Sequence, residues 1–182
     1  MASNVVLMLK PIEGESVIES DAFSETGLIE MESWNWGFDN AFDFHVGEQG
    51  QPGTGNVQDI TFTQYASKAS PDLMIACLNG TVFKEGIIFN LRTAGEGTME
   101  SFLTIKMGTV AIKDVSTGGS GEESRALETY SFNFRTYEVI YVYPDGGEVV
   151  KDYLIPHETE TYDPEGWAGE MVGEVWSGKY KK

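Results

Sequence analysis

The chain has 182 residues, of which 12 are basic and 29 acidic, giving a formal net charge of −17. This length suits a single domain with a sizeable core. A chain so acidic repels phosphate backbones, which argues against nucleic-acid binding. Cys77 is the single cysteine and cannot form an internal disulfide, which favours folding in a reducing cytosol.

The N-terminus does not have the pattern of a signal peptide. Its apolar run, residues 5–9, follows no basic residue and is too short for a signal peptide or a membrane span. We therefore expect no membrane insertion and a protein that is cytoplasmic when it is made. If the protein leaves the cell, we expect it to do so without the general secretory route.

Apolar alternation along the chain predicts a mainly β domain with one short helix. Glycine is frequent (21) and proline scarce (6), which suits short strands joined by tight turns. Two glycine-rich segments, 45–55 and 116–121, are expected to be loops. The helix is expected at 71–79 and the strands at 5–11, 27–37, 57–64, 86–93, 98–114, 128–143 and 147–154.

The segment 28–36 has two mixed faces if it is one continuous strand. Alternation then puts Ile29, Met31, Ser33 and Asn35 on one face, and Glu30, Glu32, Trp34 and Trp36 on the other. Tryptophans in this pattern are usually packing residues. The glutamates on the same face favour a contact with another molecule over a plain core.

The segment 56–80 predicts a strand followed by an abrupt, very apolar helix. Ser70 is expected to cap the helix, Pro71 to occupy its first position, and Gly80 to end it in a left-handed conformation. Residues 73–78 are apolar around the whole helix. A helix that is apolar on every side must be covered on every side, so we expect a partner beyond the barrel itself.

The long strand at 128–143 also predicts coverage on both faces. Phe132 and Phe134 lie on one face, and the large residues of the second half, Tyr137, Val139 and Tyr141, lie on the other. A strand that is apolar on both faces is covered on both faces. In a small β domain, the outward face of such a strand must be covered by a partner molecule.

No pattern in the chain predicts chemistry. The glycines at 53–55 and 116–121 lack the elements of a dinucleotide or phosphate loop. His45 and His157 have no partner at metal-ligand spacing, and the apolar neighbours of Cys77 disfavour a reactive thiolate. The many acidic pairs are expected by chance in so acidic a chain. We therefore expect no enzyme, no catalytic residue, no cofactor and no metal site.

Five short motifs occur together in an ordered set. They are IEGES at 12–16, SWNWG at 33–37, NVQD at 56–59 with LMIAC at 73–77, and VSTGGSG at 115–121. Their order and spacing closely resemble the haemolysin-coregulated protein (Hcp) family, the tube proteins of bacterial type VI secretion. The resemblance covers about residues 5–155.

This resemblance implies a fold and an assembly. The fold is a small, distorted β-barrel of two sheets with one short α-helix, and its copies form hexameric rings. Rings stack into an inner tube that a contracting sheath drives into a target cell. The barrel domain would span 1–155, and 156–182 would form a C-terminal extension whose role the family does not supply.

The resemblance also implies partners and surfaces. The partners are the sheath, baseplate and spike proteins of the apparatus, and effectors held in the ring lumen, with delivery to the outside after assembly. Asn35 would face the pore. A loop would contact the next ring through His45, Val46, Gly47, Glu48, Gln49 and Gly50. Neighbouring subunits would contact Glu30, Glu32, Trp34, Trp36, Leu73, Ala76 and Cys77.

Two other functions remain open from the sequence. A monomeric ligand-binding β-barrel would need an internal cavity with a polar mouth, and the two-sided apolar elements count against it. An enzyme using the C-terminal extension would need a nucleophile and base at suitable spacing, and none is present.

Overall fold

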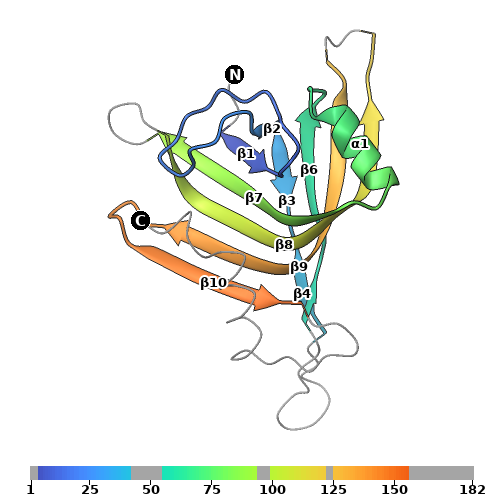
Figure 1. Cartoon of the computed structure of the whole chain (residues 1–182). Coiled ribbons are helices and arrows are strands. Elements are labelled where there is room, and N and C mark those ends of the chain that lie inside the picture. The colour runs from blue at the N-terminus through green and yellow to red at the C-terminus, as the bar shows by residue number, and fades with distance from the viewer. Residues whose placement is uncertain (1–3, 42–54, 94–98, 122–124, 156–182) are drawn as a thin grey trace.

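The computed structural model describes residues 4–41, 55–93, 99–121 and 125–155. These ranges contain ten strands and one helix (Figure 1). The elements are β1 (Val5–Met8), β2 (Ile29–Met31), β3 (Ser33–Asn35), β4 (Phe38–Asn40), β5 (Gly55–Val57), β6 (Ile60–Tyr65), α1 (Ser70–Leu78), β7 (Val82–Thr93), β8 (Met99–Gly118), β9 (Leu127–Val142) and β10 (Glu148–Leu154).

The main sheet curls into a nearly closed barrel. Its strands lie in the order β2-β1-β7-β8-β9-β6-β3, with β10 pairing with β9 outside this path. Only Glu32 separates β2 from β3, so one short segment forms both end strands of the sheet, with β2 paired to β1 and β3 paired to β6. The Glu32 N–H donates to the Thr63 carbonyl at 2.8 Å. We call residues 29–35 the barrel seam. The predicted barrel with one short helix is confirmed.

The barrel seam corrects the prediction of one continuous strand at 27–37. Before Glu32 the buried side chains are Ile29 and Met31, whereas after it Trp34 and Trp36 pack against the core. The chain bends at Glu32, so alternation is out of phase on its two sides. The tryptophans therefore do not share one continuous strand face with the glutamates.

A second, two-stranded sheet pairs β4 with β5, and the alternation pattern predicted no strand at Phe38–Asn40. Phe38 lies opposite Val57, and the Asn56 side chain donates to the Asp39 carboxylate at 2.9 Å. These three-residue strands carry one apolar residue each, so alternation could not identify them. Other boundaries also differ, since β7 begins at Val82 and β8 continues to Gly118.

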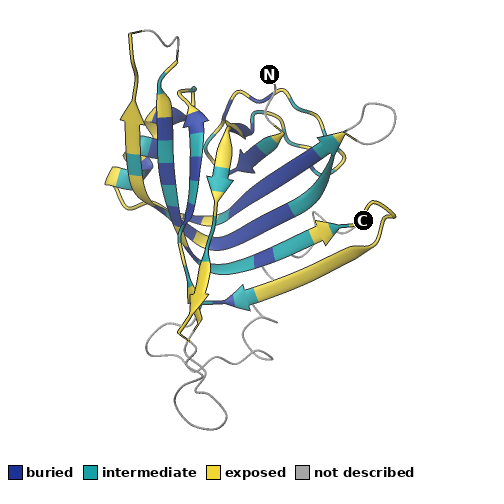
Figure 2. Cartoon of the chain, turned by 180° about the vertical axis from the view of Figure 1, so that it is seen from behind, coloured by how far each residue is buried: buried dark blue, intermediate teal, exposed yellow. Residues whose placement is uncertain are grey.

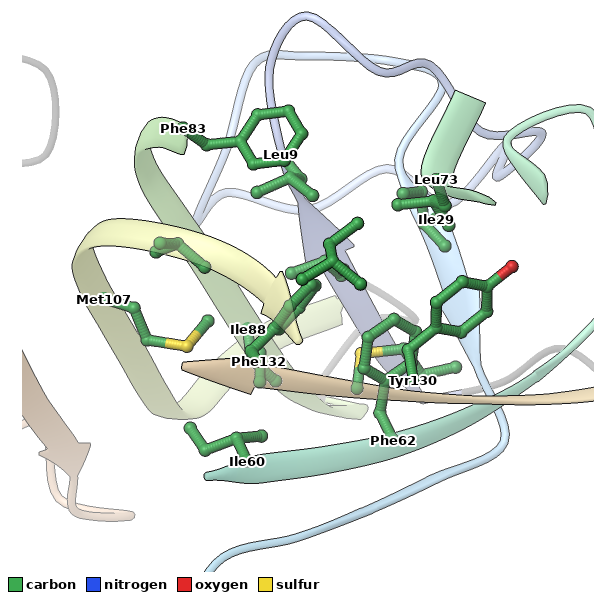
Figure 3. Close-up of a cluster of buried hydrophobic side chains, with 14 of the residues drawn as sticks. Leu9, Ile29, Ile60, Phe62, Leu73, Phe83, Ile88, Met107, Tyr130 and Phe132 are labelled. Carbon is green, nitrogen blue, oxygen red and sulfur yellow. The ribbon is translucent and has the colours of Figure 1, made fainter. Parts of the chain in front are cut away.

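The barrel interior is filled by large apolar side chains (Figure 3). Tyr130, Phe62 and Phe132 are fully buried, and the rings of Phe62 and Tyr130 stack with centroids 5.1 Å apart. Side chains from β1, β2, β6, β7, β8, β9 and α1 converge on this cluster. Each such side chain stabilises the fold by about 1.5–3 kcal/mol through burial alone.

A second apolar cluster lies on the outer face of β1 and β7. Val6 and Phe89 are buried there beneath the segment 10–28, whose Phe23 and Leu28 pack on them. The rings of Phe23 and Phe89 lie 5.0 Å apart. The chain thus covers both faces of β1 and β7 itself.

The strands β7, β8 and β9 curve strongly around the interior (Figure 1). On β8 the core residues are Ile105 and Met107 before the bend, and Val110 and Ile112 after it. Thr109 lies between them with a φ of 53°, in the left-handed region. This one residue shifts the alternation, so side chains on both halves of the strand point inward.

The helix α1 spans Ser70–Leu78, which confirms the predicted helix. The predicted cap is wrong, because Ala69 is the N-cap and no side chain caps it. Ser70 lies inside the helix, and its hydroxyl accepts from the Ser67 N–H at 2.9 Å. Gly80 has a φ of +62°, as predicted for a glycine that ends the helix.

Candidate functional site

The first sequence motif, residues 12–16, joins two parts of the fold. Gly14 N–H donates to Gly27 O at 2.7 Å, and a Cβ on Gly14 would lie 2.7 Å from the Ile29 Cα. Glu15 accepts from the Lys68 N–H at 2.9 Å, and Glu13 pairs with the Lys68 ammonium at 3.0 Å. The motif therefore fastens segment 10–28 to the loop that leads into α1.

The SWNWG and NVQD motifs hold the barrel seam in place. The Trp34 indole N–H donates to the Asn90 Oδ1 at 2.8 Å, and the Trp36 indole N–H donates to the Gln58 carbonyl at 2.9 Å. Gln58 N–H donates to Gly37 O at 3.0 Å. A Cβ on Gly37 would collide with the Gln58 side chain. Both indoles are half-buried and satisfied within the chain.

The outer face of the seam and its neighbours forms a polar wall, which we define by its two rows of paired residues. The rows run across β3, β6 and β9 and consist of Ser33, Thr63 and Thr129, and of Asn35, Thr61 and Ser131. Ser33 and Thr63 hydroxyls lie 2.7 Å apart. Every member is uncharged, and Asn35 is exposed.

An ion pair borders the polar wall. Asp59 contacts the Lys113 ammonium at 2.6 Å and accepts from the Asn133 amide at 2.7 Å. The hydrogen bond and charge of Asp59 raise the pKa of Lys113. The wall is therefore a small neutral surface at the edge of a charged one.

A buried polar cluster lies between β6, β9 and the start of α1. The Glu128 carboxylate accepts from Ser70 Oγ at 2.6 Å, Tyr130 OH at 2.8 Å and Gln64 Nε2 at 3.1 Å. Burial and the adjacent Glu128 raise the pKa of Tyr130. Because three donors converge on one carboxylate, this cluster locks α1 onto the barrel.

The predicted interface residues differ in exposure. Leu73 and Ala76 are buried within the chain, whereas Cys77, Trp34 and Trp36 are half-buried. Glu30 and Glu32 are exposed, which leaves them accessible to a neighbouring molecule. The six candidates from His45 to Gly50, His157 and the C-terminal extension lie outside the described residues. The interface and pore roles stay predictions.

The structure exposes apolar side chains that sequence reasoning did not single out. Ile75 and Leu78 on α1 are 55% and 81% exposed, and Phe38 on β4 is 55% exposed. The apolar residues on every side of α1 indicated that some of them would be exposed in the single chain. Which side of the helix faces the core could not be predicted without the fold. The exposure of Phe38 could not be predicted, because a strand of three residues is too short to show apolar alternation.

Within the described ranges, no group of three or more His, Cys, Asp or Glu side chains could hold a metal ion. Across the same residues, no helix has the length and apolarity needed to cross a membrane. A shallow hollow lies on the second sheet, lined by Phe38, Asp39, Asn40, Gly55, Asn56 and Val57.

These features define a class: a small β-barrel domain with a filled interior and exposed apolar and polar faces. The particular family follows from a match to the family model described as "Type VI secretion system effector, Hcp", over residues 6–141. The chain belongs to the Hcp family of type VI secretion. The resemblance noted in the sequence is confirmed.

Individual relatives agree with this assignment. Protein hcp1 of Pseudomonas aeruginosa is 38% identical over 97 residues, which are 53% of this chain and 59% of that protein. A type VI secretion system effector from Yersinia pestis is 28% identical, with a TM-score of 0.63 over 83% of this chain and 99% of that one. Hcp1 from Salmonella typhimurium is 25% identical, with a TM-score of 0.65 over 85% and 95%.

Proposed function

We propose that this chain is a structural subunit of the type VI secretion tube, whose copies form hexameric rings that stack into the inner tube. The observation that carries the proposal is the family match over residues 6–141, which span nearly the whole described barrel. The curated relative is matched over only 59% of its length, so the assembly of this chain is inferred and needs its own test.

In this role the subunit performs no bond-making chemistry. It would be cytoplasmic before assembly, contact sheath, baseplate and spike proteins during it, and be delivered outside the cell when the sheath contracts. The ring would supply a rigid wall and a pore. The neutral polar wall around Asn35 suits a pore that effectors must enter and leave, because it lacks fixed charge.

The assembly is tested on the purified full-length chain by size-exclusion chromatography with light scattering and by negative-stain electron microscopy. We expect a mass six times that of the chain and ring-shaped particles. A strictly monomeric species at micromolar concentration would contradict the proposal and favour the ligand-binding barrel.

The lumen assignment is tested by Asn35→Arg. Because Asn35 is exposed and lies outside the core, the variant should fold and form rings like the unchanged chain. It should change the capture of co-expressed effectors, measured by co-purification, whereas Val17→Arg should not, because Val17 is 86% exposed and lies outside the polar wall. Loss of rings in Asn35→Arg would place this residue in a subunit contact and not in the pore.

A further inference from the structure

The strand β10 lies at an open edge of the sheet in the described part of the chain. β8 pairs along one edge of β9, while β6 pairs with residues 127–132 and β10 with residues 136–142 on the other edge. β6 pairs in turn with β3, whereas the order of the described strands gives β10 no second neighbour. Figure 2 shows β10 exposed along most of its length. Such an edge can accept a further strand.

β10 exposes apolar side chains on both of its faces. Val149 and Val150 are 38% and 41% exposed, and successive residues of a strand point to opposite faces. Val149 lies opposite Tyr141 of β9, which is itself 40% exposed. An exposed apolar edge promotes aggregation unless it is covered. A strand added beside β10 would extend the cover of both faces at once.

The C-terminal extension, residues 156–182, lies outside the described residues, but its sequence predicts a strand that returns toward β10. Asp163, Pro164 and Gly166 occupy the first, second and fourth positions of a type I turn. The stretch MVGEVWS at 171–177 follows this turn and is rich in residues that favour strands. Because the chain leaves β10 at Leu154 and then reverses, this stretch runs antiparallel to β10.

We propose that residues 171–177 add to the outer edge of β10 as an antiparallel strand of the same chain, with Trp176 opposite Val149. This register fixes the other pairs, which are Val175 with Val150, Glu174 with Lys151, Gly173 with Asp152, and Val172 with Tyr153. Trp176 continues the row formed by Tyr141 and Val149, and such cross-strand pairs stabilise sheets. The pairing lies within one chain and does not depend on the ring.

The charges along this edge agree with the register. The exposed charged residues of β10 and of the turn before it are Asp145, Glu148, Lys151 and Asp152. Lys151 lies opposite Glu174, and Glu148 lies diagonally opposite Lys179. The basic residues from Lys179 onward therefore lie toward the acidic end of β10, where Asp145 and Glu148 are.

A shift of the register by one residue loses this agreement. Glu174 then lies opposite Val150 or, with the other shift, opposite Asp152. In the proposed register Gly173 adds no charge beside Asp152, whose partner on β9 is Glu138. The Glu138 carboxylate already contacts the Lys106 ammonium at 2.6 Å. The register is therefore specified by side-chain chemistry.

A disulfide in the full-length chain tests the register. With Cys77→Ala to remove the native thiol, Val149→Cys combined with Trp176→Cys should form an intramolecular disulfide on mild oxidation, identified by mass spectrometry of unreduced peptides. Lys151→Cys combined with Trp176→Cys is the matched control. It moves one sulfur about 7 Å along the strand, beyond disulfide reach, and should give at least about tenfold less cross-link.

Three results of the disulfide experiment would overturn the pairing. They are the absence of a cross-link, equal yields from the two cysteine pairs, and a disulfide that joins two chains. The last result would show that the extension pairs with another copy and not with its own barrel.

Hydrogen exchange tests the added strand without cysteines. Amides of residues 148–154 should exchange at least about tenfold more slowly in the unchanged chain than in Trp176→Asp, because the added strand protects the edge. Trp167→Asp is the matched control, since it makes the same change in the extension outside the paired stretch, and it should keep the slow exchange. Equal exchange in the unchanged chain and Trp176→Asp would contradict the proposal.

A charge exchange tests the pair of Lys151 and Glu174. Glu174→Lys places two ammonium groups opposite each other, so it should speed exchange of residues 148–154. Adding Lys151→Glu restores opposite charges and should slow the exchange again. A double variant that exchanges as fast as Glu174→Lys alone would overturn the register.

Discussion

Gly14 lies so close to the barrel seam that no side chain fits there. A Cβ at this position would collide with the Leu28 carbonyl and lie 2.7 Å from the Ile29 Cα, both of them backbone atoms. A glycine in the IEGES motif is therefore a packing requirement of the fold.

Gly14→Ala should lower the free energy of unfolding by about 1–3 kcal/mol, because the backbone of the seam must shift. Urea unfolding followed by tryptophan fluorescence measures this. Gly118→Ala is the matched control, since no atom lies within 4 Å of its added Cβ, and it should change stability by less than about 1 kcal/mol. Equal effects of the two substitutions would contradict the packing argument.

Tyr130 supplies one of three hydrogen bonds to the buried Glu128 carboxylate. Tyr130→Phe keeps the ring and removes the donor, so it should cost about 1–3 kcal/mol of folding free energy. Tyr65→Phe is the control, since Tyr65 is 40% exposed and should have little effect. A loss near zero for Tyr130→Phe would mean that the carboxylate is satisfied without it.

The same contact predicts an alkaline dependence of stability. Burial, followed by the hydrogen bond and charge of Glu128, raises the pKa of Tyr130 in the folded chain. The stability from this neutral phenol is fully present below the unfolded tyrosine pKa of about 10. It is lost as pH rises through the folded value. The stability difference between the unchanged chain and Tyr130→Phe should therefore narrow above about pH 10. Urea midpoints at pH 8 and pH 10.5 test this, and a difference that widens would contradict it.

At the scale of elements, α1 divides sharply into a buried and an exposed side. Ala76 is 6% exposed, whereas the adjacent Ile75 is 55% exposed. Ala76→Glu should cost at least about 2 kcal/mol, because it buries a carboxylate without a partner. Ile75→Glu should leave the stability of the single chain nearly unchanged. Thermal unfolding of both variants at low protein concentration checks the difference, and a wild-type-like Ala76→Glu would refute the burial argument.

The elements that sequence reasoning identified are those set by local pattern. Ile60 and Phe62 alternate inward on β6, and Pro71 and Gly80 bound α1, as their side chains and backbone preferences dictate. The bend at Glu32 was missed because it depends on pairing with two distant strands. Ser70 was misassigned because Glu128, 58 positions away, engages its hydroxyl.

The candidate site was predictable to a similar extent. The resemblance implied that Asn35 faces the pore, which stays a prediction, and the structure shows Asn35 exposed beside a row of hydroxyl groups. For α1 the sequence predicted cover from a partner, which stays a prediction, and it named Leu73 and Ala76, which the chain buries itself. Choosing Ile75 and Leu78 requires knowing which side of the helix meets the core.

At the scale of the whole molecule, the net charge of −17 opposes the approach of copies. Since salt screens this repulsion, ring stacking should become more favourable as ionic strength rises from about 0.01 M to 1 M, where the Debye length falls from roughly 30 to 3 Å. Sedimentation velocity and electron microscopy across this range measure the length of the assemblies. Shorter assemblies at high salt would show that attractive ion pairs dominate stacking.

The arrangement of the barrel also dictates when a newly made chain can fold. β9 pairs with β6, β8 and β10, and the barrel seam needs β6 on one side and β1 on the other. β1 in turn pairs with β7, so Val5 lies opposite Asn90. Until β9 has left the ribosome, β6 and β8 have no strand between them and the seam has no barrel to close. Folding of this subunit is therefore a late event in its synthesis, and the apolar strands made earlier stay exposed while translation continues.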